Sequence, residues 1–261
     1  MRKIIFLFFW VFLFLSSLSA NDQDKWQVFK STHFLIYYNN APESFISKIS
    51  DKSEEYYNKI AEDLGFSRLD FWIWDDRAKI YIYDNAGDYH RDTGEPLWSQ
   101  GATLPGHKVI YAFVDAKNFL ETTLPHEIGH IIFREFVGFN NRAIPLWLEE
   151  GVASYQEKSR HAFANQVIRA AMVNNEFIDL RELSLSQTYP RGGSIDSVGL
   201  FYAESFSVID FLIKKFSRDS FVSFCRYLRD RRDLDSTLSL NYNFTNLAEL
   251  DQAWQRYIKN E

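Results

Sequence analysis

Apolar and polar residues follow two different patterns along this chain, and the change between them divides it into two parts. Residues 26–38 (WQVFKSTHFLIYY) carry the branched and aromatic side chains typical of two short strands or a hairpin. Residues 79–83 and 108–114 predict two more strands. Apolar residues at helical spacing predict one helix that starts at Pro42 and stops at Gly65. We therefore expect a mixed sheet with a covering helix in this part.

The pattern becomes helical from Phe119 onward. The predicted helices cover residues 117–137, 145–173, 198–216, 218–231 and 246–259. The segment between the strands at 79–83 and 108–114 is rich in turn formers and is interpreted as a loop. Strands that come first and helices that follow them are typical of the α+β class.

The first twenty residues have the pattern of a secretory signal peptide. Two basic residues precede an unbroken apolar run from Ile4 to Leu15, and small residues follow it up to Ala20. We expect cleavage after Ala20, which leaves residues 21–261 as an exported mature domain. The alternative is an uncleaved membrane anchor, because the run is only slightly shorter than the roughly 20 residues that span a bilayer.

Cysteine content and charge limit the possible functions. Cys225 is the only cysteine, so the exported domain cannot form an internal disulfide and depends on its hydrophobic core. The formal net charge is -6, and loss of the basic residues at the amino terminus makes it more negative. Nucleic-acid binding is excluded on this ground, since phosphate backbones select clustered excess lysine and arginine.

The segment LPHEIGHIIFREF, from Leu124 to Phe136, carries the candidate chemistry. In a helix, His126 and His130 are four positions apart, so their rings project from one face and can bind the same cation. Glu127 follows the first histidine and can reach a water activated by the metal without being a ligand itself. A catalytic zinc site needs a third protein ligand besides the two histidines.

The candidate third ligand lies in the segment PLWLEEGVASY, from Pro145 to Tyr155. This segment resembles the gluzincin metallopeptidases, in which a W-L-x-E-G-x-A helix donates the glutamate before the glycine. That residue is Glu150 here, and nineteen residues separate it from His130, as in thermolysin-like enzymes. The adjacent Glu149 is the alternative ligand. Neighbouring residues on a helix are rotated by about 100° from each other, so only one of the two glutamates can face the metal.

The resemblance is closest to the peptidase MA-like domains of exported bacterial proteins. It implies a zincin-like fold over residues 21–261, with an α+β part at 21–137 and a helical part at 138–261. It also implies one Zn²⁺ per chain, a peptide or protein substrate, and a periplasmic or secreted location without stable membrane association if the signal is cleaved. KVIYAFV (108–114) is expected at the sheet edge where gluzincins bind extended substrate.

Two features of the site differ from the family pattern or stay open. Thermolysin-like enzymes place an aspartate four residues after the third ligand to orient a histidine, and this chain has Ser154 there. We therefore expect another residue to orient the histidine, with Ser154 as a weak substitute. Tyr202 matches the YAxS helix of the family and is the preferred oxyanion donor, with Tyr155 as the alternative.

The function expected from these residues is peptide-bond hydrolysis, with zinc held by His126, His130 and Glu150 and with Glu127 as general base. The alternative is a catalytically inactive module that keeps the fold and binds a peptide or an envelope fragment. The intact Glu127 argues against this, because a pure binder does not need a base beside the metal.

Overall fold

The computed structural model describes residues 26–66, 72–157, 164–185 and 195–260 of the chain. Its strands are β1 (Gln27–Lys30), β2 (Phe34–Tyr38), β3 (Ala78–Tyr83), β4 (Gly101–Leu104) and β5 (Val109–Phe113). They form one sheet in the order β1-β2-β3-β5-β4. The three central strands are parallel, and β1 and β4 each run antiparallel to their neighbour.

Helices make up most of the remaining described chain. The α-helices are α1 (Glu43–Leu64), α2 (Ala86–Thr93), α3 (Leu124–Val137), α4 (Leu146–Tyr155), α5 (Ala164–Asn174), α6 (Leu180–Leu185), α7 (Ile195–Phe216), α8 (Arg218–Arg231), α9 (Leu234–Tyr242) and α10 (Leu247–Asn260). The short helical turns are η2 (Trp74–Asp76), η3 (Pro105–His107) and the π-helical turn η4 (Phe119–Thr123). Of the helices in the described ranges, none has both the length and the apolar character that a bilayer crossing requires.

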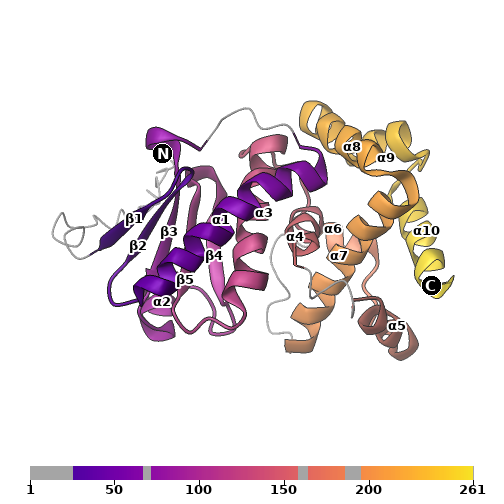
Figure 1. The fold of residues 1–261 in the computed structure, drawn as a ribbon. Helices are drawn as coiled ribbons and strands as arrows, with labels where there is room; N and C mark the ends of the chain where they lie inside the picture. The colour runs from indigo at the N-terminus through magenta and orange to yellow at the C-terminus, as the bar shows by residue number, and fades with distance from the viewer. Residues whose placement is uncertain (1–25, 67–71, 158–163, 186–194, 261) are drawn as a thin grey trace, which may run out of the picture.

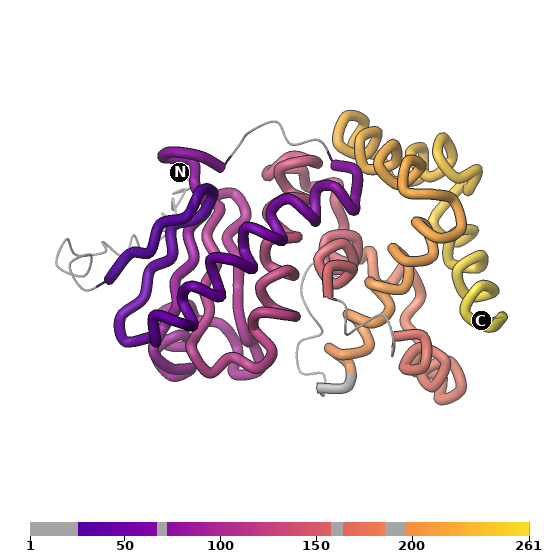
Figure 2. The backbone as a smooth tube through the Cα atoms, viewed as in Figure 1, coloured from indigo at the N-terminus to yellow at the C-terminus, as the bar shows by residue number. Residues whose placement is uncertain are grey.

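The sheet lies at one end of the molecule and the helical half at the other (Figure 1). Helix α1 runs across one face of the sheet, and α3 lies beside it next to β4. Helices α4 and α7 come next, while α8, α9 and α10 are farthest from the sheet, as the tube in Figure 2 also shows. The predicted α+β class, a mixed sheet with a covering helix followed by a mainly helical half, is confirmed.

The local sequence explains the elements that bring α1 onto the sheet. Residues of β3 alternate between buried and half-buried positions, with Ile80 and Ile82 fully buried. Helix α1 buries a stripe that includes Ile46 and Ile49 against this face. Gly65 ends the helix with a φ of 68°, a left-handed conformation that glycine adopts without a steric penalty.

The structure corrects the interpretation of residues 84–107 as a loop. This segment contains α2 and the edge strand β4. The expectation that KVIYAFV forms the sheet edge is therefore wrong, because β5 lies between β3 and β4. Gly101 and Ala102 have low intrinsic strand preference, and β4 exists because its backbone pairs with β5.

Two further differences concern the helical half. The helix expected over 145–173 is two helices, α4 and α5. Helices α6 and α9 were not predicted, since α6 has only six residues and α9 has weak amphipathic character.

Candidate metal centre

Helix α3 carries the two histidines because one side of it is apolar and the other side is not. Ile128, Ile131 and Ile132 have no exposed surface and pack in the core. His126 and His130 project from the other face, one turn apart, as predicted from their spacing. Their rings are nearly perpendicular, with centroids 4.8 Å apart.

Helix α4 brings Glu150 to these rings through two close helix contacts. A Cβ atom at Gly129 of α3 would lie 3.2 Å from the Cα atom of Ala153 in α4. A Cβ atom at Gly151 would lie 2.4 Å from the carbonyl oxygen of Ser205 in α7. The glycine after the glutamate therefore lets α4 pack directly on α7, which fixes where Glu150 stands.

The three predicted ligands converge on one point. The Nε2 atoms of His126 and His130 are 3.1 Å apart, and Oε2 of Glu150 lies 3.4 Å and 3.5 Å from them, respectively. Ligand atoms at about 2.0–2.1 Å from one ion in tetrahedral geometry are about 3.3 Å from each other. All three side chains are buried, with Glu150 only 2% exposed. These residues fit a zinc ion, and they are a group that can hold a metal.

Glu149, the competing ligand, turns away from this point. Its Oε1 atom lies 3.5 Å from Nδ1 of His130, the ring nitrogen that faces away from the other ligands. Arg134 donates two hydrogen bonds to the same carboxylate, one of them from Nε at 2.8 Å. Burial raises the pKa of Glu149, but contacts with His130 and Arg134 outweigh it and lower the pKa to about 2. The adjacent glutamates thus take different positions, one in the ligand group and one behind His130.

A residue that the sequence analysis missed holds His126. Glu157, which follows α4 and is 1% exposed, places its Oε1 atom 2.8 Å from Nδ1 of this histidine. A carboxylate at Nδ1 keeps the proton there, so that Nε2 presents its lone pair to a cation. Ser154, considered only as a weak substitute, does not perform this role, because in the described part of the chain its buried hydroxyl makes no hydrogen bond.

The electrostatic balance of the site favours a bound cation. Burial alone lowers the pKa of His126, but hydrogen bonds to Glu150 and Glu157 outweigh it and raise the pKa to about 9. Burial also lowers the pKa of His130, but the negative charge of Glu150 and contacts with Glu149 outweigh it and raise the pKa well above its ordinary value. Carboxylates that stabilise a positive charge on imidazole also stabilise a metal ion between the rings.

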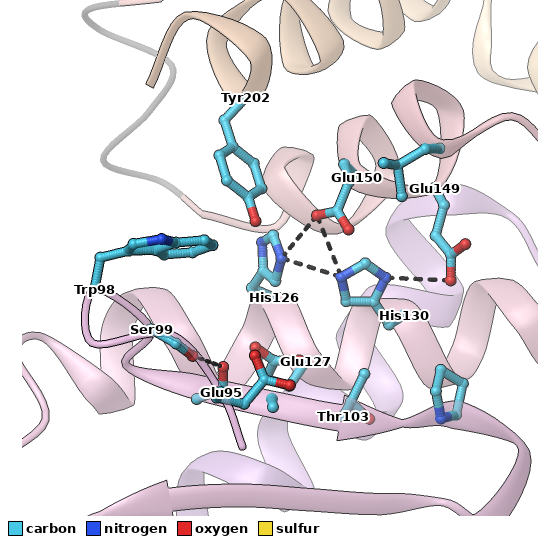
Figure 3. A pocket seen from close by; sticks show the side chains of 14 residues that line it. Glu95, Trp98, Ser99, Thr103, His126, Glu127, His130, Glu149, Glu150 and Tyr202 are labelled. Carbon is cyan, nitrogen blue, oxygen red and sulfur yellow. Dashed lines mark hydrogen bonds and ion pairs between the residues drawn. The ribbon is translucent and has the colours of Figure 1, made fainter. Parts of the chain in front are cut away.

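Glu127 lies on the wall of the same pocket without joining the ligand group (Figure 3). It is 6% exposed, and burial raises the pKa of its carboxyl. Gly101 in β4 keeps space beside it, since a Cβ atom there would lie 2.5 Å from Thr123 and 3.6 Å from a Glu127 oxygen. A carboxylate with a raised pKa next to an open space is suited to accept a proton.

An open pocket of about 260 Å³ gives access to the centre. The loop before β4, β4 itself, α3, α4 and α7 form its walls, and Tyr202 enters from α7 with its hydroxyl directed inward (Figure 3). The ring centroids of Tyr202 and His126 are 6.0 Å apart. Tyr155 is not among the described residues that line the pocket; it stacks on Phe206 instead. The geometry therefore favours Tyr202 of the two tyrosines.

Comparisons with known proteins agree with this description. The family model of the Peptidase MA superfamily matches residues 72–260, which include every residue of the centre. Native yeast LTA4 hydrolase is a similar solved structure, with a TM-score of 0.53 and 14% sequence identity. The match covers 88% of this chain and 38% of the yeast protein, so the chain spans well under half of that protein's length. At this identity the likeness concerns the fold alone.

No curated protein matches the chain. The family match extends over most of the sequence, from the strand that precedes the pocket loop to the last helix. The chain therefore belongs to the Peptidase MA superfamily.

Proposed function

We propose that this protein is a zinc-dependent peptidase. The observation that carries the proposal is the convergence of His126, His130 and Glu150, whose ligand atoms lie 3.1–3.5 Å apart. Family membership supports the same class of chemistry. Glu127 supports hydrolysis over binding alone, because it places a buried carboxylate beside the centre where a base is needed.

The residues of the pocket divide the work of peptide hydrolysis. The chemistry that zinc supplies in such a site is Lewis-acid chemistry, which acidifies water and polarises a carbonyl group. Glu127 accepts a proton from the attacking water and passes it to the leaving amine. Tyr202 donates a hydrogen bond from its hydroxyl to the oxygen of the peptide carbonyl as negative charge develops there. Glu157 keeps the His126 ring oriented throughout.

The edge strand β4 suggests how a peptide binds. Its residues Gly101, Ala102 and Thr103 line the pocket, and β4 is the last strand on this side of the described sheet. An extended peptide can therefore add to β4 through main-chain hydrogen bonds, with its scissile bond near the metal. This arrangement supports a peptide or protein substrate, and the substrate-binding role expected for residues 108–114 is proposed for Gly101–Leu104 instead.

Zinc content per chain, measured on wild type and on the Glu150→Ala variant, tests the centre. We expect about one zinc per chain for wild type and a clear loss in Glu150→Ala. The matched control is Glu149→Ala, which removes a neighbouring carboxylate and should retain more zinc. If Glu149→Ala loses zinc while Glu150→Ala retains it, the ligand assignment is wrong.

Activity on a broad peptide library tests the reaction. Glu127→Gln should abolish turnover and keep zinc, since the side chain is not a ligand. Hydrolysis by this variant in a clean preparation would refute the role of Glu127. If zinc-loaded wild type binds peptides and cleaves none, the chain is the inactive binding module instead.

Export is the second part of the proposal. The pattern of residues 1–20 supports a cleaved secretory signal and a mature domain that starts at Asn21, located in the periplasm or outside the cell. Mass spectrometry of the protein purified from its native host measures the amino terminus directly. A retained apolar segment would instead establish a membrane anchor.

A further inference from the structure

The loop before β4 brings a fourth carboxylate to the pocket, beside those of Glu127, Glu149 and Glu150. Glu95 and Trp98, which lie between α2 and β4, line the pocket together with the metal ligands. Figure 3 shows Glu95 on the wall that also carries Glu127, with the indole ring of Trp98 extending above it toward His126. Neither residue has a role in the metal centre or in the proposed proton transfers.

This loop is held in place by hydrogen bonds at both ends. The hydroxyls of Tyr89 and Ser99 are 2.7 Å apart, and the Ser99 hydroxyl also donates to the carbonyl oxygen of Gly101 at 2.8 Å. Nδ1 of His90 lies 3.1 Å from the carbonyl oxygen of Glu95. Tyr89 and Ser99 are both buried. The Glu95 carboxylate is therefore presented from a fixed backbone, which reduces the entropy lost when a ligand binds.

The two basic side chains of the described pocket, His126 and His130, belong to the ligand group and pair with Glu150 rather than with the Glu95 carboxylate. Burial raises the pKa of Glu95, and His90 partly opposes this. No lysine or arginine is among the described residues that line the pocket. Glu149, in contrast, is paired with Arg134. A partly buried carboxylate without a cationic partner is costly to keep in an apolar setting, and a ligand that brings a positive charge removes that cost.

The neighbouring aromatic ring adds to this preference. Trp98 is 43% exposed, so one part of its ring remains accessible at the pocket. An indole face attracts a cation placed within about 6 Å of its centre. Glu95 and Trp98 thus offer two independent attractions for a positive charge, and both come from one short loop.

From this geometry we propose that Glu95 and Trp98 form an anionic subsite beside the metal centre, which binds a positively charged group of the substrate close to the scissile bond. The inference rests on the proposed peptidase function and names its substrate class. The charged group is either the free amino terminus of a peptide or a lysine or arginine side chain.

Four hydroxamates, which chelate zinc, separate these sources. The two charges to be separated are the α-ammonium group and the side-chain ammonium group. Nα-acetyl-norleucine hydroxamate has neither of them, and lysine hydroxamate has both. Norleucine hydroxamate has only the α-ammonium group, and Nα-acetyl-lysine hydroxamate has only the side-chain ammonium group. Their dissociation constants are measured by titration calorimetry on zinc-loaded full-length protein, for wild type, Glu95→Gln and the control Glu62→Gln. Glu62 lies on the exposed face of α1, away from the pocket residues.

We expect Glu95→Gln to weaken binding of at least one singly charged probe about 10- to 100-fold, as for hydrogen bonds to charged groups. The neutral probe should change by less than about twofold, and Glu62→Gln should change none of them, because charge at distant exposed sites is screened. The probe that loses affinity identifies the source, amine or side chain.

Two results overturn the inference. Equal binding of charged and neutral probes by wild type contradicts an anionic subsite, and so does an equal effect of Glu95→Gln on all four probes. If the chain does not hold zinc, the result is different, because the neutral probe, which binds through zinc alone, then fails to bind wild type at all. If the probes bind with the expected charge preference and no peptide is cleaved, the subsite stands and only the catalytic proposal falls.

Discussion

Replacing Glu157 with glutamine isolates the support that one carboxylate gives to the metal centre. In the structure Oε1 of Glu157 lies 2.8 Å from Nδ1 of His126, and the glutamate side chain is 2% exposed. Water therefore cannot replace the lost charge. Glutamine keeps the size of the side chain and a carbonyl oxygen that accepts a hydrogen bond from Nδ1–H, so the ring orientation can persist while the charge is removed.

The expected magnitude follows from the role of such partners. Loss of a residue that orients a metal-bound histidine costs about 10- to 100-fold in metal affinity. This corresponds to about 1.4–2.7 kcal/mol of binding free energy. We place Glu157→Gln within that range, because the contact is short, buried and charged. Glu157→Ala should cost more, since it also removes the oxygen that fixes the ring.

The assay is competition for zinc against a chromogenic chelator at constant pH, which gives the dissociation constant of each variant. Ser154→Ala is the matched control, because it changes a buried residue one turn after Glu150 whose hydroxyl makes no hydrogen bond in the described chain. Thermal unfolding confirms that each variant is folded. A zinc affinity of Glu157→Gln within about twofold of wild type would refute the role of this carboxylate.

Three further predictions concern the pocket and the helices behind it. Tyr202→Phe should lower kcat by about 10- to 100-fold and change KM little, because the hydroxyl acts mainly on the transition state; an unchanged kcat removes Tyr202 from the mechanism. Gly151→Ala should lower the free energy of unfolding by about 1–3 kcal/mol in denaturant titration, since its Cβ would meet the Ser205 carbonyl at 2.4 Å, and an unchanged midpoint contradicts this close contact. Burial raises the pKa of Glu204 to about 8, above the ordinary 4.5, so the wild-type fold loses stability as pH rises between these values. Glu204→Gln, which keeps an acceptor for the Ile178 amide, should therefore be more stable than wild type at pH 9, on the order of 5 kcal/mol, and equally stable near pH 4. If the variant and wild type differ in stability by the same amount at pH 4 and pH 9, the raised pKa of Glu204 is contradicted.

The parts of the site that the sequence predicts are those whose spacing is set within one helix. His126 and His130 face one cation because four residues make about one helical turn. Glu150 was preferred over Glu149 because it matches the helix motif of the family, and the 100° rotation between neighbours indicated that only one of them can face the metal. The structure places both glutamates as that rotation requires, one toward the ligand group and the other behind His130.

Glu157 was missed although its signal is present in the sequence. It lies seven residues after Glu150, a spacing that would return to the same side if the helix continued, although α4 ends at Tyr155 and Glu157 follows it. Attention to Ser154 followed the family spacing of four residues, where a short side chain replaces an aspartate. A longer glutamate one turn further on reaches the imidazole instead.

Glu95 could not be placed in the same way, because its position depends on two elements that local patterns do not predict. Helix α2 has eight residues, and β4 becomes a strand only by pairing with β5. The loop that carries Glu95 and Trp98 ends at Gly101, whose missing side chain also leaves room beside Glu127. The candidate metal ligands are thus fixed by helix geometry, whereas the residues proposed to select the substrate depend on the tertiary path of a loop. For this reason the candidate metal ligands can be predicted from the sequence, while the proposed charge preference of the pocket requires the structure.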